Sequence, residues 1–166
     1  LDSGRWTLEP GTSVLSVRGG GPGPRDALGL VRELRERDWI DTDGAFGMKG
    51  QVAVTYRVTG GGSSVVETLF AGTPHEMTTV YYKDGKHVAL THYCSAGNQP
   101  RMRATTTDGN ALDFAFDGGT NLNPATDGHM HAGRIEFVGP DRVKAHWIGW
   151  DKGKPSGHSP TFTLAR

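Results

Sequence analysis

The chain has 166 residues, and its 18 basic residues balance 18 acidic ones, for a formal net charge of +0 at pH 7. This length suits one domain, and a chain without a net positive field is a poor partner for nucleic acid. A single cysteine, Cys94, excludes an internal disulfide and any zinc or iron–sulfur site built from several cysteines.

The N-terminal part contains the one helix that the sequence predicts, from Pro24 to Arg37. Leu28, Val31 and Leu34 repeat there at helical spacing, and Pro24 suits a first helical turn. Strands are expected near 5–9 and 13–18, and a Gly-rich stretch at 19–23 separates them from the helix. Residues 1–23 are therefore interpreted either as an arm or as the first strands of the domain.

The remaining residues, 38–166, have the pattern of successive β-hairpins. Short runs rich in Val, Thr, Tyr and Phe alternate with glycine clusters and Asp-Gly pairs. Strands are predicted near 51–59, 64–71, 76–83, 86–94, 101–106, 111–116, 128–138, 141–150 and 160–165. Consecutive hairpins favour an antiparallel up-and-down β-barrel, which closes its own edges, over a sandwich. We expect one all-β domain over 1–166, with a helix at 24–37 and a barrel body at 38–166.

The loops of such a barrel fall into two groups. Because each strand reverses direction, the loops after Phe70, Cys94 and Phe116 lie at one end, which we call the site end. Tight hairpins at Asp84-Gly85 and Asp108-Gly109 lie at the opposite end. The site-end loops are longer and more polar, and long polar loops on a rigid scaffold are where function tends to reside.

Histidines gather near the site end. Strand alternation places His92 and Cys94 on one face of their strand, and His129 and His131 on one face of another. Both pairs are predicted to point into the barrel. An unpaired imidazole is costly to bury, so these side chains need hydrogen-bond partners, a ligand or a metal.

One hypothesis is a transition-metal site. His92, His129 and His131 are tentative ligands for zinc or copper, with His75 or Glu76 as a further donor. The strands of His92 and His129 are separated by two others, so these donors have to meet across the lumen. The alternative is a satisfied polar network in the core. Cys94 is interpreted either as a thiolate nucleophile beside a histidine or as a small packed residue.

Other polar residues have two interpretations each. Arg101 either clamps a carboxylate ligand or is a solvated strand residue, and Asn98 and Gln99 either contact a ligand or satisfy turn backbone. Glu67 is either an interior carboxylate that partners a histidine or a solvated one. The predicted ligand-binding residues are His75, Glu76, His92, Cys94, Asn98, Gln99, Arg101, His129 and His131.

Three runs carry a family resemblance: Glu-Thr-Leu-Phe-Ala-Gly-Thr-Pro-His-Glu-Met (67–77), Thr-His-Tyr-Cys-Ser-Ala-Gly-Asn-Gln-Pro-Arg-Met (91–102) and His-Met-His (129–131). They resemble an uncharacterised bacterial family of calycin or lipocalin-like barrels. The helix leading into Trp39, followed by a β-meander, is similar to that superfamily over roughly residues 25–166. The resemblance implies a cavity for a small, largely apolar ligand, and in some relatives, such as nitrobindins, a haem held by histidine. Fold-level analogy does not choose between them.

The sequence therefore predicts a small-molecule-binding β-barrel with a His-lined cavity at one open end. The alternative is an enzyme that uses zinc, copper or haem at the same His/Cys cluster. No apolar run reaches the ~18 residues of a membrane span, and the expected partner is a small molecule, not nucleic acid. We expect a soluble protein, either cytoplasmic or exported with its signal removed; the oligomeric state is left open.

Overall fold

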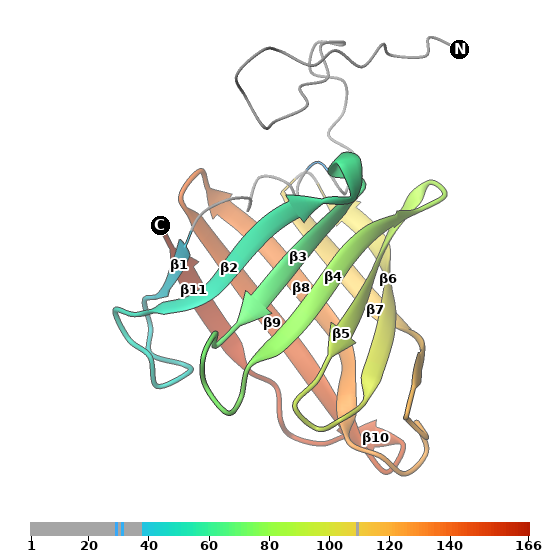
Figure 1. Ribbon diagram of the computed structural model, residues 1–166. Coiled ribbons are helices and arrows are strands. Elements are labelled where there is room, and N and C mark those ends of the chain that lie inside the picture. The colour runs from blue at the N-terminus through green and yellow to red at the C-terminus, as the bar shows by residue number, and fades with distance from the viewer. Residues whose placement is uncertain (1–28, 30, 32–37, 109) are drawn as a thin grey trace, which may run out of the picture.

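The computed structural model describes residues 29, 31, 38–108 and 110–166. These residues form a closed antiparallel β-barrel of ten strands (Figure 1). The strands are β1 (Asp38–Asp41), β2 (Val52–Thr59), β3 (Ser64–Leu69), β4 (Met77–Asp84), β5 (His87–Tyr93), β6 (Gln99–Asp108), β7 (Ala111–Thr120), β8 (His129–Gly139), β9 (Arg142–Asp151) and β11 (Thr161–Ala165). A two-residue strand, β10 (Lys154–Pro155), pairs with the end of β9.

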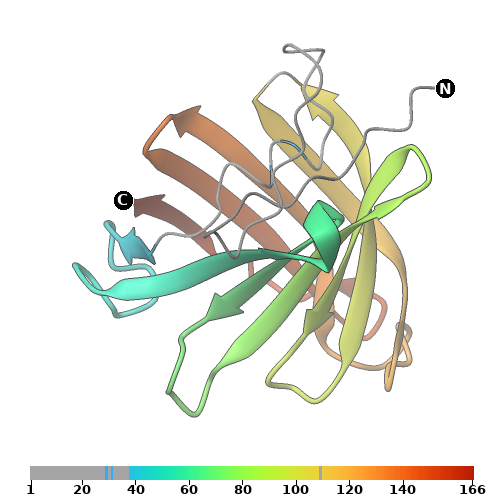
Figure 2. The same cartoon turned by 45° about the horizontal axis from the view of Figure 1, so that its top comes forward.

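The strands follow an up-and-down order that closes on itself. Each of β1 to β8 pairs with the next strand in the chain, β9 pairs with both β8 and β11, and β11 pairs with β1. The strands consequently surround a common interior (Figure 2). The prediction of an all-β, antiparallel up-and-down barrel is confirmed.

The N-terminal predictions lie outside the described residues. This applies to the strands near 5–9 and 13–18 and to the helix at 24–37, of which Gly29 and Val31 alone are described. Val31 is buried in the core. Within the described ranges, the helical element is a 3-10 turn, η1 (Gly60–Gly62), between β2 and β3, and no helix there is long and apolar enough to cross a membrane.

Most strand positions follow the sequence prediction, with a few differences. The short strands β1 and β10 were not predicted, because four and two residues are too few to show an alternating pattern. Strand β7 continues beyond its predicted end at 116 to Thr120, through a register shift opposite Pro100 and Met102. Gly118 adopts a positive φ of 98° there, which a residue without a Cβ tolerates.

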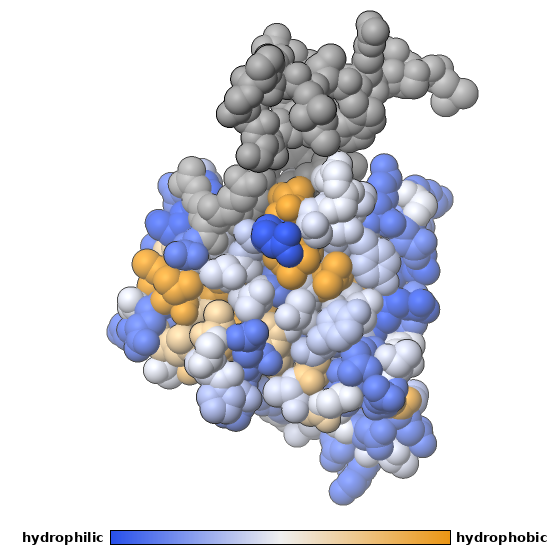
Figure 3. Space-filling model, in the orientation of Figure 1, coloured by the Kyte–Doolittle hydropathy of each residue, from blue (hydrophilic) through white to orange (hydrophobic). Residues whose placement is uncertain are grey.

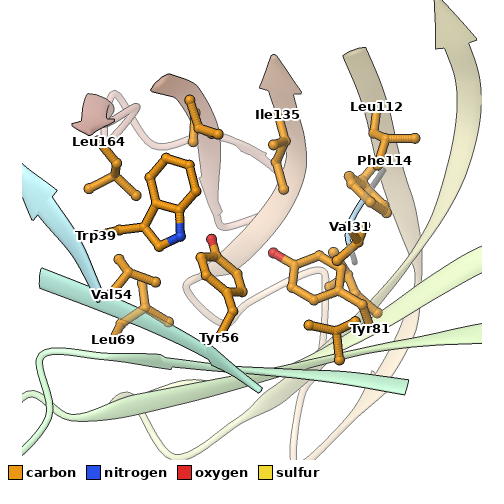
Figure 4. Packing of buried hydrophobic residues seen from close by; sticks show 14 of the residues in the cluster. Val31, Trp39, Val54, Tyr56, Leu69, Tyr81, Leu112, Phe114, Ile135 and Leu164 are labelled. Carbon is orange, nitrogen blue, oxygen red and sulfur yellow. The ribbon is translucent and has the colours of Figure 1, made fainter. Parts of the chain in front are cut away.

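The barrel interior is filled by large apolar side chains. Trp39, Tyr81, Leu90, Met102 and Leu112 are each less than 2% exposed. Trp39, Tyr56, Tyr81 and Phe114 project into this interior from the surrounding strands (Figure 4). Burying a side chain of this size contributes about 1.5–3 kcal/mol. Because successive side chains point to opposite faces of a strand, this core requires one face of each strand to be apolar.

The outer surface is mainly hydrophilic or intermediate on the face shown in Figure 3, and hydrophobic residues form one group at its left edge and another near its upper centre. Ile40 on β1 and Val52 on β2 form an exposed cross-strand pair. Tyr93 and Val138 are the other large exposed hydrophobic residues in the described part of the chain. Single apolar residues on an outer β-surface are ordinary.

One close packing contact depends on a glycine. Gly133 on β8 pairs with Trp147 on β9, and a Cβ added at Gly133 would lie 2.3 Å from the Trp147 ring. The indole therefore occupies the space that any side chain at this position would need. Trp147 packs against the core from there.

We expect Gly133→Ala to destabilise the barrel by about 1–3 kcal/mol, because Trp147 has to leave its position. Gly139→Ala on the same strand is the matched control, since nothing lies within 4 Å of its added Cβ. Urea unfolding followed by tryptophan fluorescence measures both. Equal stabilities of the two variants would contradict this account of the packing.

Candidate functional site

Five loops meet at the site end of the barrel. They connect β1 to β2, β3 to β4, β5 to β6, β7 to β8 and β9 to β11, and they lie opposite η1 and the β4–β5 hairpin (Figure 1). The first and last of these loops, 42–51 and 152–160, were not among those considered from sequence. Together the loops surround the mouth of the barrel.

A pocket of about 350 Å³ lies within the barrel at this end. Four of the loops contribute to its rim: Phe46, His75, Ser95 and His158 each come from a different one. Its described lining residues are Ala45, Phe46, Glu67, Leu69, Phe70, His75, Met77, Thr79, His92, Cys94, Ser95, Met130, Trp147, His158, Pro160 and Phe162. The walls are thus mainly apolar.

Three polar side chains interrupt the apolar wall and form what we call the interior polar row: Glu67, Thr79 and His92. Glu67 on β3 pairs with Thr79 on β4, which in turn pairs with His92 on β5. Their exposed fractions are 5%, 1% and 9%. Pairing across three adjacent strands brings the three side chains side by side on the inner face of the sheet.

Glu67 is held by a tyrosine hydroxyl group. The Tyr81 hydroxyl donates to Oε2 at 3.1 Å. Burial raises the pKa of Glu67, while the nearby hydroxyl groups of Tyr56, Thr79 and Tyr81 act in the opposite direction. Burial also raises the pKa of both tyrosines, so they remain neutral donors.

His92 extends the row toward the pocket. Its Nδ1 lies 3.0 Å from Thr79 Oγ1, while its Nε2 makes no hydrogen bond with any described residue. Burial lowers the pKa of His92 to about 4, because the apolar surroundings disfavour the imidazolium. At neutral pH this side chain is an uncharged imidazole with one nitrogen available.

Three of the predicted site residues meet in the pocket. His75 is exposed at the rim, Cys94 is half-buried, and both share the lining with His92. Glu67, whose orientation was open from sequence, faces inward and contacts His92 through Thr79. The lone thiol therefore lies against a cavity instead of being fully packed in the core.

His129 and His131 lie in a different cluster. His129 Nε2 is 3.0 Å from His131 Nδ1, and His129 Nδ1 donates to the Asp127 carbonyl at 2.8 Å. The His131 ring is stacked between Trp150, at 3.8 Å between centroids, and Phe116, at 4.8 Å. Met130, which lies between these two histidines on β8, lines the pocket, whereas the histidines do not.

The tentative metal set is therefore not assembled as predicted. The described residues contain no group of three or more His, Cys, Asp or Glu side chains placed to hold a metal ion. The prediction that both histidines point into the lumen assumed strict alternation along β8. A register shift between Met130 and Ala132 breaks this alternation. His129 and His131 instead satisfy each other, whereas His92 bonds to Thr79.

Two more predicted site residues, Glu76 and Arg101, have partners outside the pocket. Glu76 accepts from the Gly72 amide at 2.6 Å and so closes its own loop. Arg101 donates to the Asp117 carbonyl at 2.9 Å and pairs with its carboxylate at 3.5 Å. These contacts fit structural roles in a loop and on a strand.

Asn98 and Gln99 also lie outside the pocket lining. Gln99 accepts from Thr120 and Asn121, which ties the β5–β6 loop to the end of β7. Asn98 donates to the Gly128 carbonyl at 2.8 Å, whereas its buried Oδ1 has no hydrogen-bond partner. Both amides join neighbouring loops.

Sequence reasoning missed a buried carboxylate that shapes the rim. Asp41 is fully buried and accepts from the backbone amides of Gly44, Phe46 and Met48 at 2.8, 3.3 and 3.3 Å. It thereby fixes the loop that places Phe46 against Phe70 and Phe162, with ring centroids 4.7 and 4.3 Å apart. The run Asp-Thr-Asp-Gly at 41–44 is the available signal, since aspartate before glycine favours such turns.

No protein-family model and no curated protein matches this chain. The barrel agrees with the fold that the calycin resemblance implies, while membership of that superfamily stays a proposal.

The buried His92 predicts a pH-dependent stability. Below its ordinary pKa of 6.5 the unfolded chain binds a proton at this residue, while the folded chain does not until about pH 4. Stability should therefore fall as the pH is lowered from 6.5 to 4, by on the order of 3 kcal/mol from this residue.

His92→Gln should flatten this dependence, which urea unfolding at several pH values measures. His87→Gln, at an exposed position on the same strand, should keep it. The raised pKa of Glu67 makes stability change with pH in the opposite direction. The test is therefore the difference in pH dependence between His92→Gln and His87→Gln. If the stability of the two variants changes with pH in the same way, His92 is not a buried neutral imidazole.

Asp41→Asn should destabilise the fold by about 1–3 kcal/mol, because the amide group brings a donor to a position surrounded by backbone donors. Asp38→Asn, exposed on the same strand, should change stability by less than about 0.5 kcal/mol. Thermal or urea unfolding compares them. If Asp41→Asn leaves the stability unchanged, the Asp41 carboxylate does not hold the rim in place.

Proposed function

We propose that this protein binds a small, largely apolar molecule in the pocket at the site end. The observation that carries the proposal is a cavity of about 350 Å³ with aromatic and aliphatic walls and a few convergent polar groups. Its volume lies within the roughly 300–1,000 Å³ typical of ligand pockets, which share this composition.

The polar groups of the pocket also support a binding role. Glu67, Thr79 and His92 are buried and line the pocket, and His92 Nε2 has no hydrogen-bond partner among the described residues. Burying a polar atom that has no partner is unfavourable, so a ligand group that pairs with it contributes to affinity. The calycin resemblance implies the same kind of ligand.

Catalysis is less well supported by this geometry. A general base acts best when its pKa is close to the working pH, and the pKa of His92 is about 4. The predicted zinc or copper ligands are dispersed over two clusters. Haem binding would need an axial ligand from the lining histidines, His75, His92 and His158, and a Soret band in the purified protein would favour it over the ligand proposed here.

A neutral fluorescent probe tests the proposal. N-phenyl-1-naphthylamine should bind with one site per chain and increase in fluorescence, because the apolar walls exclude water from it. Ser95→Trp should weaken binding at least tenfold by placing an indole at the rim, since Ser95 lines the pocket.

Ala96→Trp is the matched control, because Ala96 is the next residue of the same exposed turn but does not line the pocket. It should bind the probe like the natural chain. Absence of binding to the natural chain, or equal losses in the two variants, would contradict the proposed function.

A further inference from the structure

Aromatic rings and thioethers surround the pocket. The described lining residues that carry one of these groups are Phe46, Phe70, Trp147, Phe162, Met77 and Met130. They come from β4, β8, β9 and β11 and from the β1–β2 and β3–β4 loops. A ligand in this space therefore meets rings or sulfur atoms on several sides.

Three of these rings pack together, and we call them the rim phenylalanine group: Phe46, Phe70 and Phe162. The Phe46 ring contacts both of the others, with its centroid 4.7 Å from that of Phe70 and 4.3 Å from that of Phe162. Its angle to the Phe70 ring is 72°, which is an edge-to-face contact. Phe70 and Phe162 are buried and Phe46 is half-buried. The group thus joins the barrel core to the mouth of the pocket.

Phe70 has a backbone conformation that is unfavourable for a bulky residue. Its φ is 54°, in the left-handed region that glycine adopts readily and a phenylalanine rarely does. Hydrogen bonds hold it there: its amide donates to the Ala53 carbonyl at 2.9 Å, and its carbonyl accepts from the amide and hydroxyl of Thr73 at 3.1 and 2.8 Å. Strained residues of this kind cluster at functional sites. A ring at this strained position, on the pocket wall, supports a role for that ring in binding.

Phe46 is held by a separate constraint. The buried Asp41 carboxylate accepts from the backbone amides of Gly44, Phe46 and Met48, which fixes the loop on which this ring lies. A loop that is already ordered loses little conformational entropy when a ligand binds. The rings of Phe46 and Phe70 are therefore each set in place by the backbone before any ligand arrives.

These walls favour a ligand that has an aromatic ring. Edge-to-face or offset contacts between rings are favourable beyond the burial of apolar area. Contacts between a thioether sulfur and a ring are favourable as well, and Met77 and Met130 supply two such sulfur atoms. A saturated ligand of the same size gains the burial but neither of these interactions.

We infer that the pocket selects molecules that carry an aromatic ring, which packs against the rim phenylalanine group. This inference rests on the proposed function and specifies its ligand class. Phe46, Phe70 and Phe162 are then the residues that determine specificity.

Competition against N-phenyl-1-naphthylamine tests the inference with a matched pair of ligands, 2-phenylethanol and 2-cyclohexylethanol. The two are uncharged and share a carbon skeleton and a hydroxyl group, so they differ in the aromaticity of the ring. The measured quantity is the affinity for 2-phenylethanol divided by that for 2-cyclohexylethanol. Comparing this ratio between variants cancels the difference in hydration of the two ligands. The affinity of each variant for N-phenyl-1-naphthylamine is measured first.

Phe46→Leu and Phe162→Leu should each lower this ratio by about two- to tenfold, because leucine keeps an apolar wall but lacks the ring. Phe137→Leu is the matched control and should keep the ratio of the natural chain. Phe137 is buried on β8 but does not line the pocket. Phe46 lies on a loop and is half-buried, so its variant keeps the test open if Phe162→Leu fails to fold.

Failures of the two proposals are distinguishable. If the natural chain binds neither N-phenyl-1-naphthylamine nor either alcohol, the proposed function fails. If it binds N-phenyl-1-naphthylamine but not 2-phenylethanol, the aromatic inference is overturned while the binding function stands. The same conclusion follows if the ratio in Phe46→Leu and Phe162→Leu equals that in Phe137→Leu.

Discussion

Closure of the sheet is the constraint on which the rest of this structure depends. Because β9 pairs with both β8 and β11, and β11 with β1, the ten strands have no free edge and enclose one interior. Every inward side chain must then either fill that space or find a partner within it. Trp39, Tyr81, Leu90 and Met102 fill it at the core. Toward the site end the filling is incomplete, and the pocket remains.

The pocket combines apolar walls with polar groups that are already paired. Glu67 accepts a hydrogen bond from Tyr81, and His92 is neutral at pH 7 and bonded to Thr79. His92 lines the cavity, and its Nε2 has no hydrogen-bond partner among the described residues. A preorganised polar group in an apolar site gives a ligand its orientation at little cost in side-chain entropy. The rim is held in a comparable way, since the buried Asp41 fixes the loop that carries Phe46.

Sequence patterns predicted the fold more fully than the site. Hairpin signals and alternation gave the strands from β2 onward and the end at which the loops gather, because both depend on local backbone geometry. The site residues depend on which face each strand turns inward. For β5 the alternation held up to His92. For β8 a register shift at Met130 and Ala132 intervened, and such a bulge has no reliable signal in a single sequence.

The sequence by itself determined the all-β class, the antiparallel order and the side of the barrel on which His92 and Cys94 lie, since alternation and chain reversal follow from covalent geometry. Only the tertiary structure decided which histidines share a space. His92 joins Glu67 through Thr79, while His129 and His131 bond to each other beside Phe116 and Trp150. These contacts join side chains across neighbouring strands and between loops, and their distances depend on strand register and closure of the sheet, which no local pattern encodes.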